Sequence, residues 1–112
     1  MRLRTALTAG TAALVLVLST AGSSSAAAGE FRYTSVDLNN VQVRHVLEDP
    51  ASGVCIDLEG TANLPALLGR NYTDAEATLF QDAACEGDTW WVVNPGLNAP
   101  AGARFRSVVF SG

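Results

Sequence analysis

Short apolar runs separated by turn residues extend from residue 30 to the end of the chain. Turn chemistry is clearest in DPASG at 49–53, where a proline fixes one backbone angle and a glycine allows a positive φ. No stretch keeps a helical apolar period over three turns, so runs of this length are typical of β-strands. We therefore predict an all-β domain with six strands, at 30–36, 41–49, 54–60, 76–82, 88–93 and 104–110.

The segment 61–75, TANLPALLGRNYTDA, does not fit this pattern. We expect either a short helical turn around residues 66–68 or an irregular crossing between two sheets. Within it, NYT at Asn71 is formally a glycosylation sequon. We interpret it as a turn in which Asn71 or Asp74 bonds to backbone amides.

The N-terminus has the three parts of a secretory signal peptide. Arg2 and Arg4 are followed by an apolar run that includes AALVLVL, and then by the small residues GSSSAAAG. The apolar segment contains threonine and glycine and is shorter than the ~20 apolar residues of a membrane-spanning helix, which disfavours a membrane anchor. We predict cleavage after Ala28, with residues 1–28 as the signal peptide, residues 29–112 as a single domain, and a secreted, extracellular product.

The charge balance argues against a nucleic-acid partner. Loss of Arg2 and Arg4 from the chain's seven basic residues leaves five arginines against 11 acidic residues, a net charge of −6. Such a surface repels phosphate groups and anionic lipids. The sequence contains no cluster of basic residues to reverse this locally. We therefore expect neither nucleic acid nor, after cleavage, a membrane as partner.

The chain has two cysteines, Cys55 and Cys85. An exported domain lies in an oxidising environment, where we expect the two thiols to form a disulfide. A cross-link that closes a loop of about 30 residues contributes roughly 3–4 kcal/mol in the loop-closure model. A domain of this size buries little surface and depends on such a cross-link. A free catalytic thiol is the disfavoured alternative.

Candidate catalytic and metal-binding groups are few. His45 is the only histidine, and no nucleophile motif accompanies it. A zinc site lacks ligands once the cysteines are paired. The acidic side chains, including Asp57 and Glu59 on one strand face, are those expected on a solvated surface. We therefore predict no catalytic residue, no metal site and no enzymatic activity.

Four residues in the C-terminal half carry a resemblance to a known family. Phe80, Cys85 and Gly87 in FQDAACEG, followed by Ser107 in RFRSVVF, are spaced like the key residues of a βγ-crystallin Greek-key motif. Cysteine stands where that motif usually has a second aromatic residue. The chain is more similar to small secreted bacterial crystallin-like proteins, which include a metalloproteinase inhibitor family. The resemblance implies a two-sheet Greek-key sandwich with one disulfide, in which Phe80 packs over the corner and Gly87 is structural.

The resemblance also raises the question of calcium, the usual ligand of the family. Calcium-binding crystallins place two adjacent Asn or Asp residues shortly before the closing serine. Here Gly102 and Ala103 precede Ser107, with Arg104 and Arg106 nearby, so oxygen ligands are missing. We expect no specific calcium site and no cofactor.

By resemblance, the expected function is non-enzymatic binding of an extracellular protease by a monomer. The alternative is a structural or toxin-like protein that acts on cell envelopes. A substrate-like inhibitor presents a rigid extended segment. Two proline-containing segments offer leucines for this purpose: NLPALLG at 63–69, with Leu67 and Leu68, and NPGLNAPAG at 94–102, with Leu97. Capping of the core is the alternative role of these leucines.

Trp90 and Trp91 are consecutive in a predicted strand, so their side chains must point to opposite faces. One of them belongs to the core and the other lies nearer solvent. We add Trp91 to the candidate binding residues, because an exposed tryptophan is a common anchor of binding surfaces. Packing of that side chain under a loop is the structural alternative.

Overall fold

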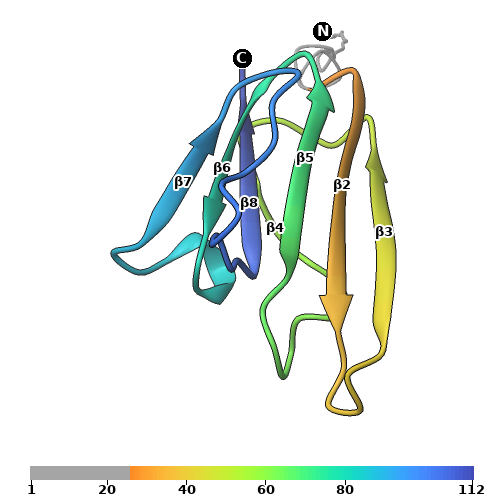
Figure 1. Ribbon diagram of the computed structural model, residues 1–112. Helices are drawn as coiled ribbons and strands as arrows, with labels where there is room; N and C mark the ends of the chain where they lie inside the picture. Colours follow the sequence, from red (N-terminus) through yellow and green to blue (C-terminus); the bar gives the residue numbers. More distant parts are fainter. Residues whose placement is uncertain (1–25) are drawn as a thin grey trace, which may run out of the picture.

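A computed structural model describes residues 26–112, and most of the predicted signal peptide lies outside this range. The described residues form strands and a single 3-10 turn, η2 (Ala83–Cys85) (Figure 1). The strands are β2 (Gly29–Val36), β3 (Gln42–Glu48), β4 (Cys55–Asp57), β5 (Leu67–Thr73), β6 (Glu76–Phe80), β7 (Trp90–Val93) and β8 (Ser107–Ser111). No helix in residues 26–112 is long and apolar enough to cross a membrane.

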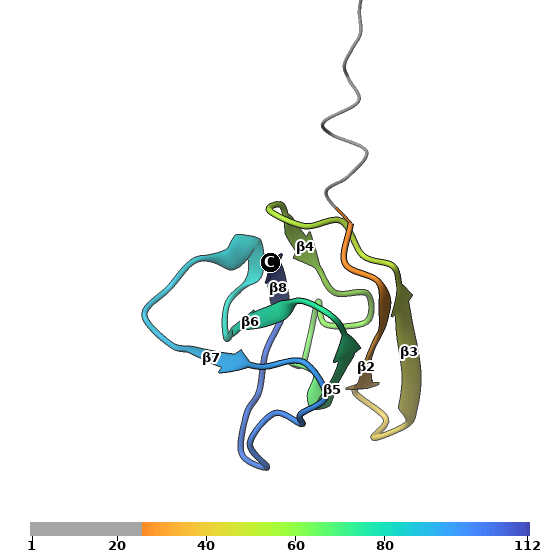
Figure 2. The same cartoon turned by 90° about the horizontal axis from the view of Figure 1, so that it is seen from above.

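The strands form two antiparallel sheets with the orders β3-β2-β5 and β4-β8-β6-β7. Figure 2, which looks down on the strands, shows the sheets as separate layers. The predicted all-β, two-sheet architecture is confirmed, and each of the six predicted strands overlaps an observed one. Five are shorter than predicted; the largest difference is at 54–60, of which only Cys55–Asp57 is a strand, and 104–110 begins its regular pairing at Ser107.

The two halves of the described chain share one topology, although their sequences show no repeat. In each half the first strand, β2 or β6, lies between the second and the fourth. The third strand crosses to the other sheet: β4 pairs with β8, and the irregular segment 94–106 bonds to β5. This second crossing is marked by bridges from Asn98 to Arg70 and from Phe105 to Ala66.

The prediction for 61–75 was wrong, because this segment contains strand β5. Its inward positions are Gly69, Asn71 and Thr73, which are small or polar, while the large side chains between them are exposed. The apolar alternation that identifies a half-buried strand is therefore absent, even though the backbone pairs regularly with β2 over most of its length.

The core lies between the sheets and is dominated by phenylalanines. Phe31 meets the rings of Phe105 and Phe110 edge-on, with centroid distances of 6.3 and 5.6 Å. All three are fully buried, as are Leu79 and Val108. Edge-to-face packing of this kind adds to the stabilisation gained from burying the rings.

Residues 26–28 belong to the folded domain. Ala26 bridges to Ala51, and the buried Ala27 donates its N–H to the carbonyl oxygen of Pro50 at 2.8 Å. The N–H of Ala28 donates to a carboxylate oxygen of Asp74 at 2.9 Å. Cleavage one or two residues before the predicted position would therefore retain contacts that cleavage after Ala28 removes.

We expect alkaline pH to destabilise the domain through Tyr33. Burial, and secondarily the charge of Glu59, raises the pKa of Tyr33 to about 12, and its hydroxyl donates to the carbonyl oxygen of Glu59 at 3.1 Å. In the unfolded chain a tyrosine titrates with a pKa of ~10. The stability that neutral Tyr33 gives the folded domain is therefore fully present below pH ~10 and is lost as the pH rises towards ~12. The change is on the order of 2–3 kcal/mol. Urea unfolding at pH 9 and pH 11.5 measures it.

The variant Tyr33→Phe should lose most of this pH dependence, whereas Tyr72→Phe should keep it. Tyr72 is the matched control because its side chain is exposed. An equal alkaline loss in wild type and Tyr33→Phe would show that other groups cause it.

Candidate functional site

The connection between β6 and β7 folds over the second sheet and is held by Ser107. The buried Ser107 hydroxyl donates to the carbonyl oxygen of Asp82 at 2.6 Å and accepts the N–H of Cys85 at 2.9 Å. Gly87 has φ +95°, and a Cβ there would collide with the Asp82 carboxylate. Phe80 is half-buried beside Trp90, with a ring centroid distance of 6.3 Å. The corner is therefore a structural unit.

The disulfide between Cys55 and Cys85, predicted from the sequence, is present, with a Cα–Cα distance of 5.9 Å. It ties η2 to strand β4. A second link runs in parallel, because the Asp57 carboxylate accepts the N–H of Ala84 at 2.7 Å. Together with Ser107, these contacts fix the folded corner against β4 and β8.

The corresponding β2–β3 connection is not folded over. The two strands pair without a register shift from Glu30 opposite Glu48 to Val36 opposite Gln42. At the tip, the Asp37 carboxylate accepts two backbone N–H groups at 2.9 Å each, so the hairpin is a defined turn that extends away from the domain (Figure 1). The outer face of the first sheet consequently lacks the cover that the corner gives to the second.

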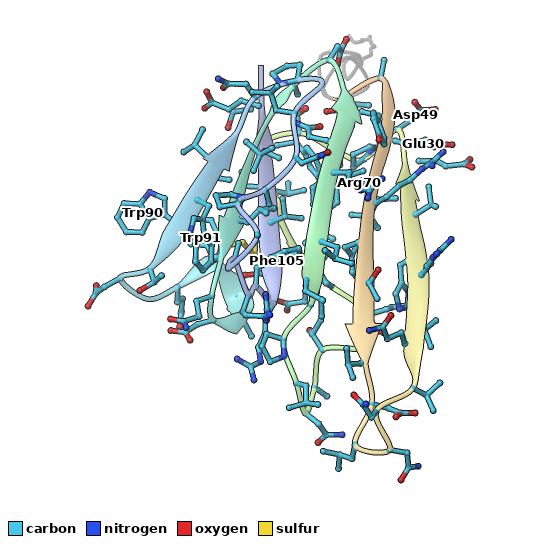
Figure 3. The ribbon with its side chains drawn as sticks, viewed as in Figure 1. Glu30, Asp49, Arg70, Trp90, Trp91 and Phe105 are labelled. Atoms are coloured by element: carbon cyan, nitrogen blue, oxygen red, sulfur yellow. A yellow bond between two sulfur atoms is a disulfide. The ribbon has the colours of Figure 1, made fainter. Side chains whose placement is uncertain are left out.

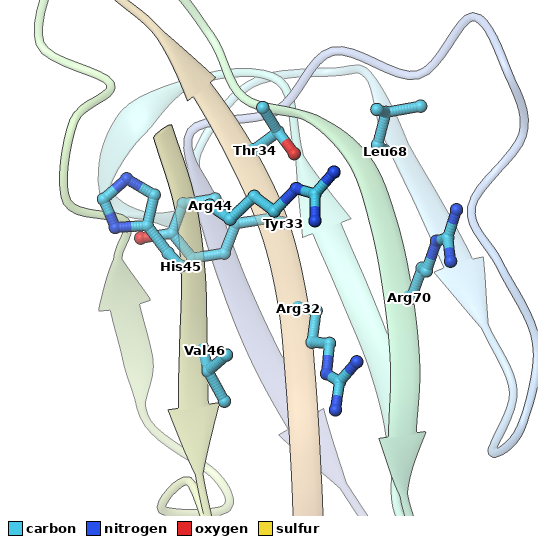
Figure 4. Close-up of a pocket in the computed structure, with 8 residues that line it drawn as sticks. All are labelled: Arg32, Tyr33, Thr34, Arg44, His45, Val46, Leu68 and Arg70. Carbon is cyan, nitrogen blue, oxygen red and sulfur yellow. The ribbon is translucent and has the colours of Figure 1, made fainter. Parts of the chain in front are cut away.

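This open face carries a pocket of about 280 Å³. We call it the arginine pocket, and Figure 4 shows its side chains. Those used below are Arg32, Arg44, Arg70, Thr34, Val46 and Leu68. The register explains the arrangement: on β2, Arg32 lies opposite Val46 and Arg70, and Thr34 lies opposite Arg44. Strand pairing thus gathers three arginines that are far apart in the sequence.

The prediction that basic residues do not cluster was therefore wrong for the folded chain. Arg32 forms a salt bridge of 2.7 Å with Glu30, and this hydrogen bond and charge raise its pKa. Its guanidinium also lies over the Tyr72 ring, 5.3 Å from the centroid. Within residues 26–112, neither Arg44 nor Arg70 has an acidic side chain within salt-bridge distance. The pocket thus contains two guanidinium groups without a protein counter-ion in the described part of the chain.

Leu68 reaches the pocket through a bulge in β5. Arg32 pairs with Arg70, but Thr34 pairs with Leu67, so β5 carries one residue more than β2 over this interval. Leu68 has φ +58° and is 50% exposed. A positive φ is rare and strained for a leucine. The bulge thus turns a large apolar side chain outward beside the arginines.

The structure brings the two predicted leucine segments together. The N–H of Asn71 donates to the carbonyl oxygen of Leu97 at 2.9 Å, and the N–H of Ala99 donates to that of Gly69 at 2.8 Å. Residues 69–71 and 96–99 therefore run side by side, and we call these two stretches, together with Leu67 and Leu68, the leucine surface. Leu97 is 55% exposed, and Leu67 is half-buried. Neither Leu68 nor Leu97 belongs to the buried core.

Trp90, rather than Trp91, is the exposed tryptophan. Trp90 is 53% exposed and points away from the domain, whereas Trp91 is half-buried and packs against the core (Figure 3). The predicted division between opposite faces is confirmed, but the candidate Trp91 lies on the inner face. Trp90 and the exposed Val92 lie on the outer face of β7, the edge strand of the second sheet.

The remaining candidates for chemistry are a serine–histidine contact and the side chains that could bind a metal ion. Ser35 Oγ lies 2.8 Å from His45 Nε2, and the His45 ring stacks on Tyr33 at 4.7 Å. Ser35 is buried, and the backbone of Gly60 covers it so closely that a Cβ there would lie 2.6 Å from the hydroxyl. This serine is closed to a substrate. In the part of the chain that the structure describes, no three His, Cys, Asp or Glu side chains are grouped so as to hold a metal ion.

Comparison of the chain with models of protein families, with curated proteins and with solved structures found no match. Any family assignment is therefore a proposal. It depends on the topology of the two sheets and on the corner held by Ser107.

Proposed function

We propose that the chain is an exported domain of the βγ-crystallin Greek-key type. The related arrangement of the two halves supports this proposal, because β4 crosses to the sheet of the second half and the irregular segment 94–106 crosses to β5 of the first. The contacts at the corner also support it. Phe80 and Gly87 are at the motif positions, and the Ser107 hydroxyl bonds to both Asp82 and Cys85, as a closing serine should. The disulfide agrees with an oxidising location outside the cell.

We further propose that the domain acts by binding rather than by catalysis, and that its partner is an extracellular protease. The observation that carries this proposal is the leucine surface, where Leu68 and Leu97 are exposed on two segments joined by backbone hydrogen bonds. Exposed leucines fit the hydrophobic specificity pockets of proteases. A surface fixed before binding loses little conformational entropy when the complex forms.

The hydrogen bonds around Leu97 indicate how it would engage a protease. Its N–H donates to the carbonyl oxygen of Asn94 at 3.1 Å, and its own carbonyl oxygen accepts the N–H of Asn71. Gly96 N–H donates back to the carbonyl oxygen of Asn71 at 2.7 Å. Both backbone groups of Leu97 are therefore engaged within the domain. Inhibition would result from the side chain blocking the cleft, without the extended backbone pairing of a substrate.

We expect Leu68→Ala and Leu97→Ala each to weaken inhibition about tenfold or more, because a buried anchor side chain at an interface contributes ~1.4 kcal/mol or more. The free energy of unfolding should change by less than ~1 kcal/mol, since both side chains are largely exposed. Inhibition constants and urea unfolding curves of the same preparations measure the two effects.

Val54→Ala is the matched control, since Val54 is equally exposed and lies outside the leucine surface. A stability loss of ~2–5 kcal/mol in the leucine variants would show that the leucines cap the core. Unchanged inhibition in both variants would place the inhibitory contact elsewhere.

A further inference from the structure

We propose that the arginine pocket binds an acidic peptide segment, in which two carboxylate side chains meet Arg44 and Arg70 and an apolar side chain meets Leu68. This inference goes beyond the proposed protease binding and does not depend on the partner being a protease. It assigns a ligand chemistry to Arg44 and Arg70, which the proposed leucine contact with a protease does not use, although the pocket shares Leu68 with the leucine surface.

The distribution of charge is the first argument. Residues 26–112 contain five arginines and 11 acidic residues, yet three of the arginines line one pocket. Arg32 is engaged by Glu30, while Arg44 and Arg70 have no acidic partner in the described chain. With acids in such excess, two unneutralised guanidinium groups in one pocket favour a ligand that brings its own negative charge. Guanidinium groups bind carboxylates by paired, charge-assisted hydrogen bonds.

The spacing of the two arginines is the second argument. Arg44 lies on β3 and Arg70 on β5, so β2 separates them. Their partners on β2, Thr34 and Arg32, are two residues apart, so the two arginines are offset by two residues along the strands. Strand geometry then places their backbones roughly 12 Å apart, from two spacings of ~4.8 Å and one step of ~6.8 Å. In Figure 4 both side chains extend over this face. Carboxylates at alternate positions of an extended peptide are ~6.8 Å apart, a separation that long arginine side chains can reach.

The surroundings of the pocket favour a short acidic segment over a continuous polyanion. Glu30 and Glu48 lie opposite each other on the same two strands, one pair beyond Arg32 and Val46, and Asp49 follows them. These acids border the arginines on one side. A nucleic acid or an anionic membrane would extend across them and be repelled. Leu68 and the exposed Val46 supply the apolar contact that a peptide side chain can use.

The conformation of Leu68 is the third argument. The bulge holds this leucine at a positive φ, and the buried Gly69 beside it packs closely under the core, since a Cβ there would lie 3.0 Å from the Phe105 ring. The outward position of Leu68 is thus set by the packing beneath it. The exposed Leu68 side chain adds no hydrophobic burial to the stability of the free domain, although its backbone is strained. It is, however, available for contact with a ligand.

Fluorescence anisotropy tests the proposal with the full protein, its disulfide intact, at low salt. The probe is labelled Glu-Ala-Glu-Ala-Leu with blocked ends, compared with Gln-Ala-Gln-Ala-Leu and Glu-Ala-Glu-Ala-Ala. We expect the acidic leucine peptide to bind at least tenfold more tightly than the glutamine peptide and several-fold more tightly than the alanine peptide. The double variant Arg44→Gln/Arg70→Gln should weaken its binding tenfold to a hundredfold.

Arg104→Gln/Arg106→Gln is the matched control, because it removes the same charge outside the pocket and should leave binding within twofold. Melting curves establish that the variants fold. Equal weakening by both double variants, equal binding of the acidic and glutamine peptides, or complete displacement by equimolar inorganic phosphate would each overturn the proposal. It would also be overturned if sedimentation found a wild-type dimer that Arg44→Gln/Arg70→Gln dissociates and no peptide binding, since a second copy would then occupy this face.

Discussion

Reduction of the Cys55–Cys85 disulfide is expected to lower the free energy of unfolding by about 3–4 kcal/mol. The two residues are 30 apart in sequence, and opening the loop between them restores chain entropy to the unfolded state. The bond also connects η2 to the three-residue strand β4, which lies at the edge of its sheet and pairs with β8 alone. For a small domain with ~5–15 kcal/mol of total stability, this is a large fraction. Urea unfolding with and without a thiol reductant measures it.

The double variant Cys55→Ser/Cys85→Ser is the control for this measurement. It should unfold at the same urea concentration with and without reductant, and that concentration should match reduced wild type. The Ser107 and Asp57 hydrogen bonds remain in the variant and should keep the corner folded in water. A loss below ~1 kcal/mol would show that those hydrogen bonds, rather than the disulfide, hold the corner.

Asn71→Asp should destabilise the protein by about 3–5 kcal/mol at pH 7. Asn71 is fully buried, and its Nδ2 donates to the carbonyl oxygens of Ala75 at 2.8 Å and Val93 at 2.9 Å. Its Oδ1 accepts the N–H and the hydroxyl of Thr73 at 3.1 and 2.6 Å. The substitution keeps the shape of the side chain but replaces the two donors with an anion that faces two carbonyl oxygens. Urea unfolding of the variant and wild type measures the difference.

The pH dependence of this difference identifies its cause. The unfavourable site raises the pKa of the introduced carboxyl in the folded state, so the penalty grows as the pH rises above the unfolded value of ~3.9 and shrinks below it. The stability gap should therefore be smaller at pH 4 than at pH 7. Asn63→Asp, at an exposed position, should cost less than ~0.5 kcal/mol. A gap that is independent of pH would contradict the charge explanation.

The same contacts revise the interpretation of the NYT sequon. Asn71 lies in strand β5 and not in a turn, although its side chain does accept the backbone N–H of Thr73 as expected. Asp74 likewise accepts a backbone N–H, that of Ala28. Nδ2, the atom to which a glycan is attached, is buried and bonded to two carbonyl oxygens. The folded domain therefore offers no access for glycosylation at this residue.

The sequence predicts the strands whose inward residues are apolar, because burial imposes an alternation that can be read directly. Strand β5 could not be predicted in this way. Its buried positions are Gly69, Asn71 and Thr73, so its stability comes from hydrogen bonds and close packing under Phe105, which leave no hydrophobic period. Only the unusual content of the segment, with glycine and asparagine between large side chains, distinguishes it from a loop.

The candidate site depends on register, and register cannot be read from composition. Arg32, Arg44 and Arg70 are dispersed along the sequence, and only the pairing of β3 and β5 with β2 brings them to one face. Strand parity correctly separates Trp90 from Trp91, but it does not say which face is inner. The placement of Leu97 against β5, the strand that carries Leu68, results from the crossing of segment 94–106, a long-range contact with no local signal.

Titration of secreted metalloproteases and serine proteases with the purified, disulfide-bonded domain is the most direct measurement of the proposed function. Each protease is held at a fixed concentration, and its residual activity is followed as the domain is added. We predict that the activity of at least one metalloprotease falls linearly to near zero at equimolar domain, as expected for a tight complex with a preorganised surface. Full activity of every protease at a tenfold excess of the domain would contradict the inhibitor proposal.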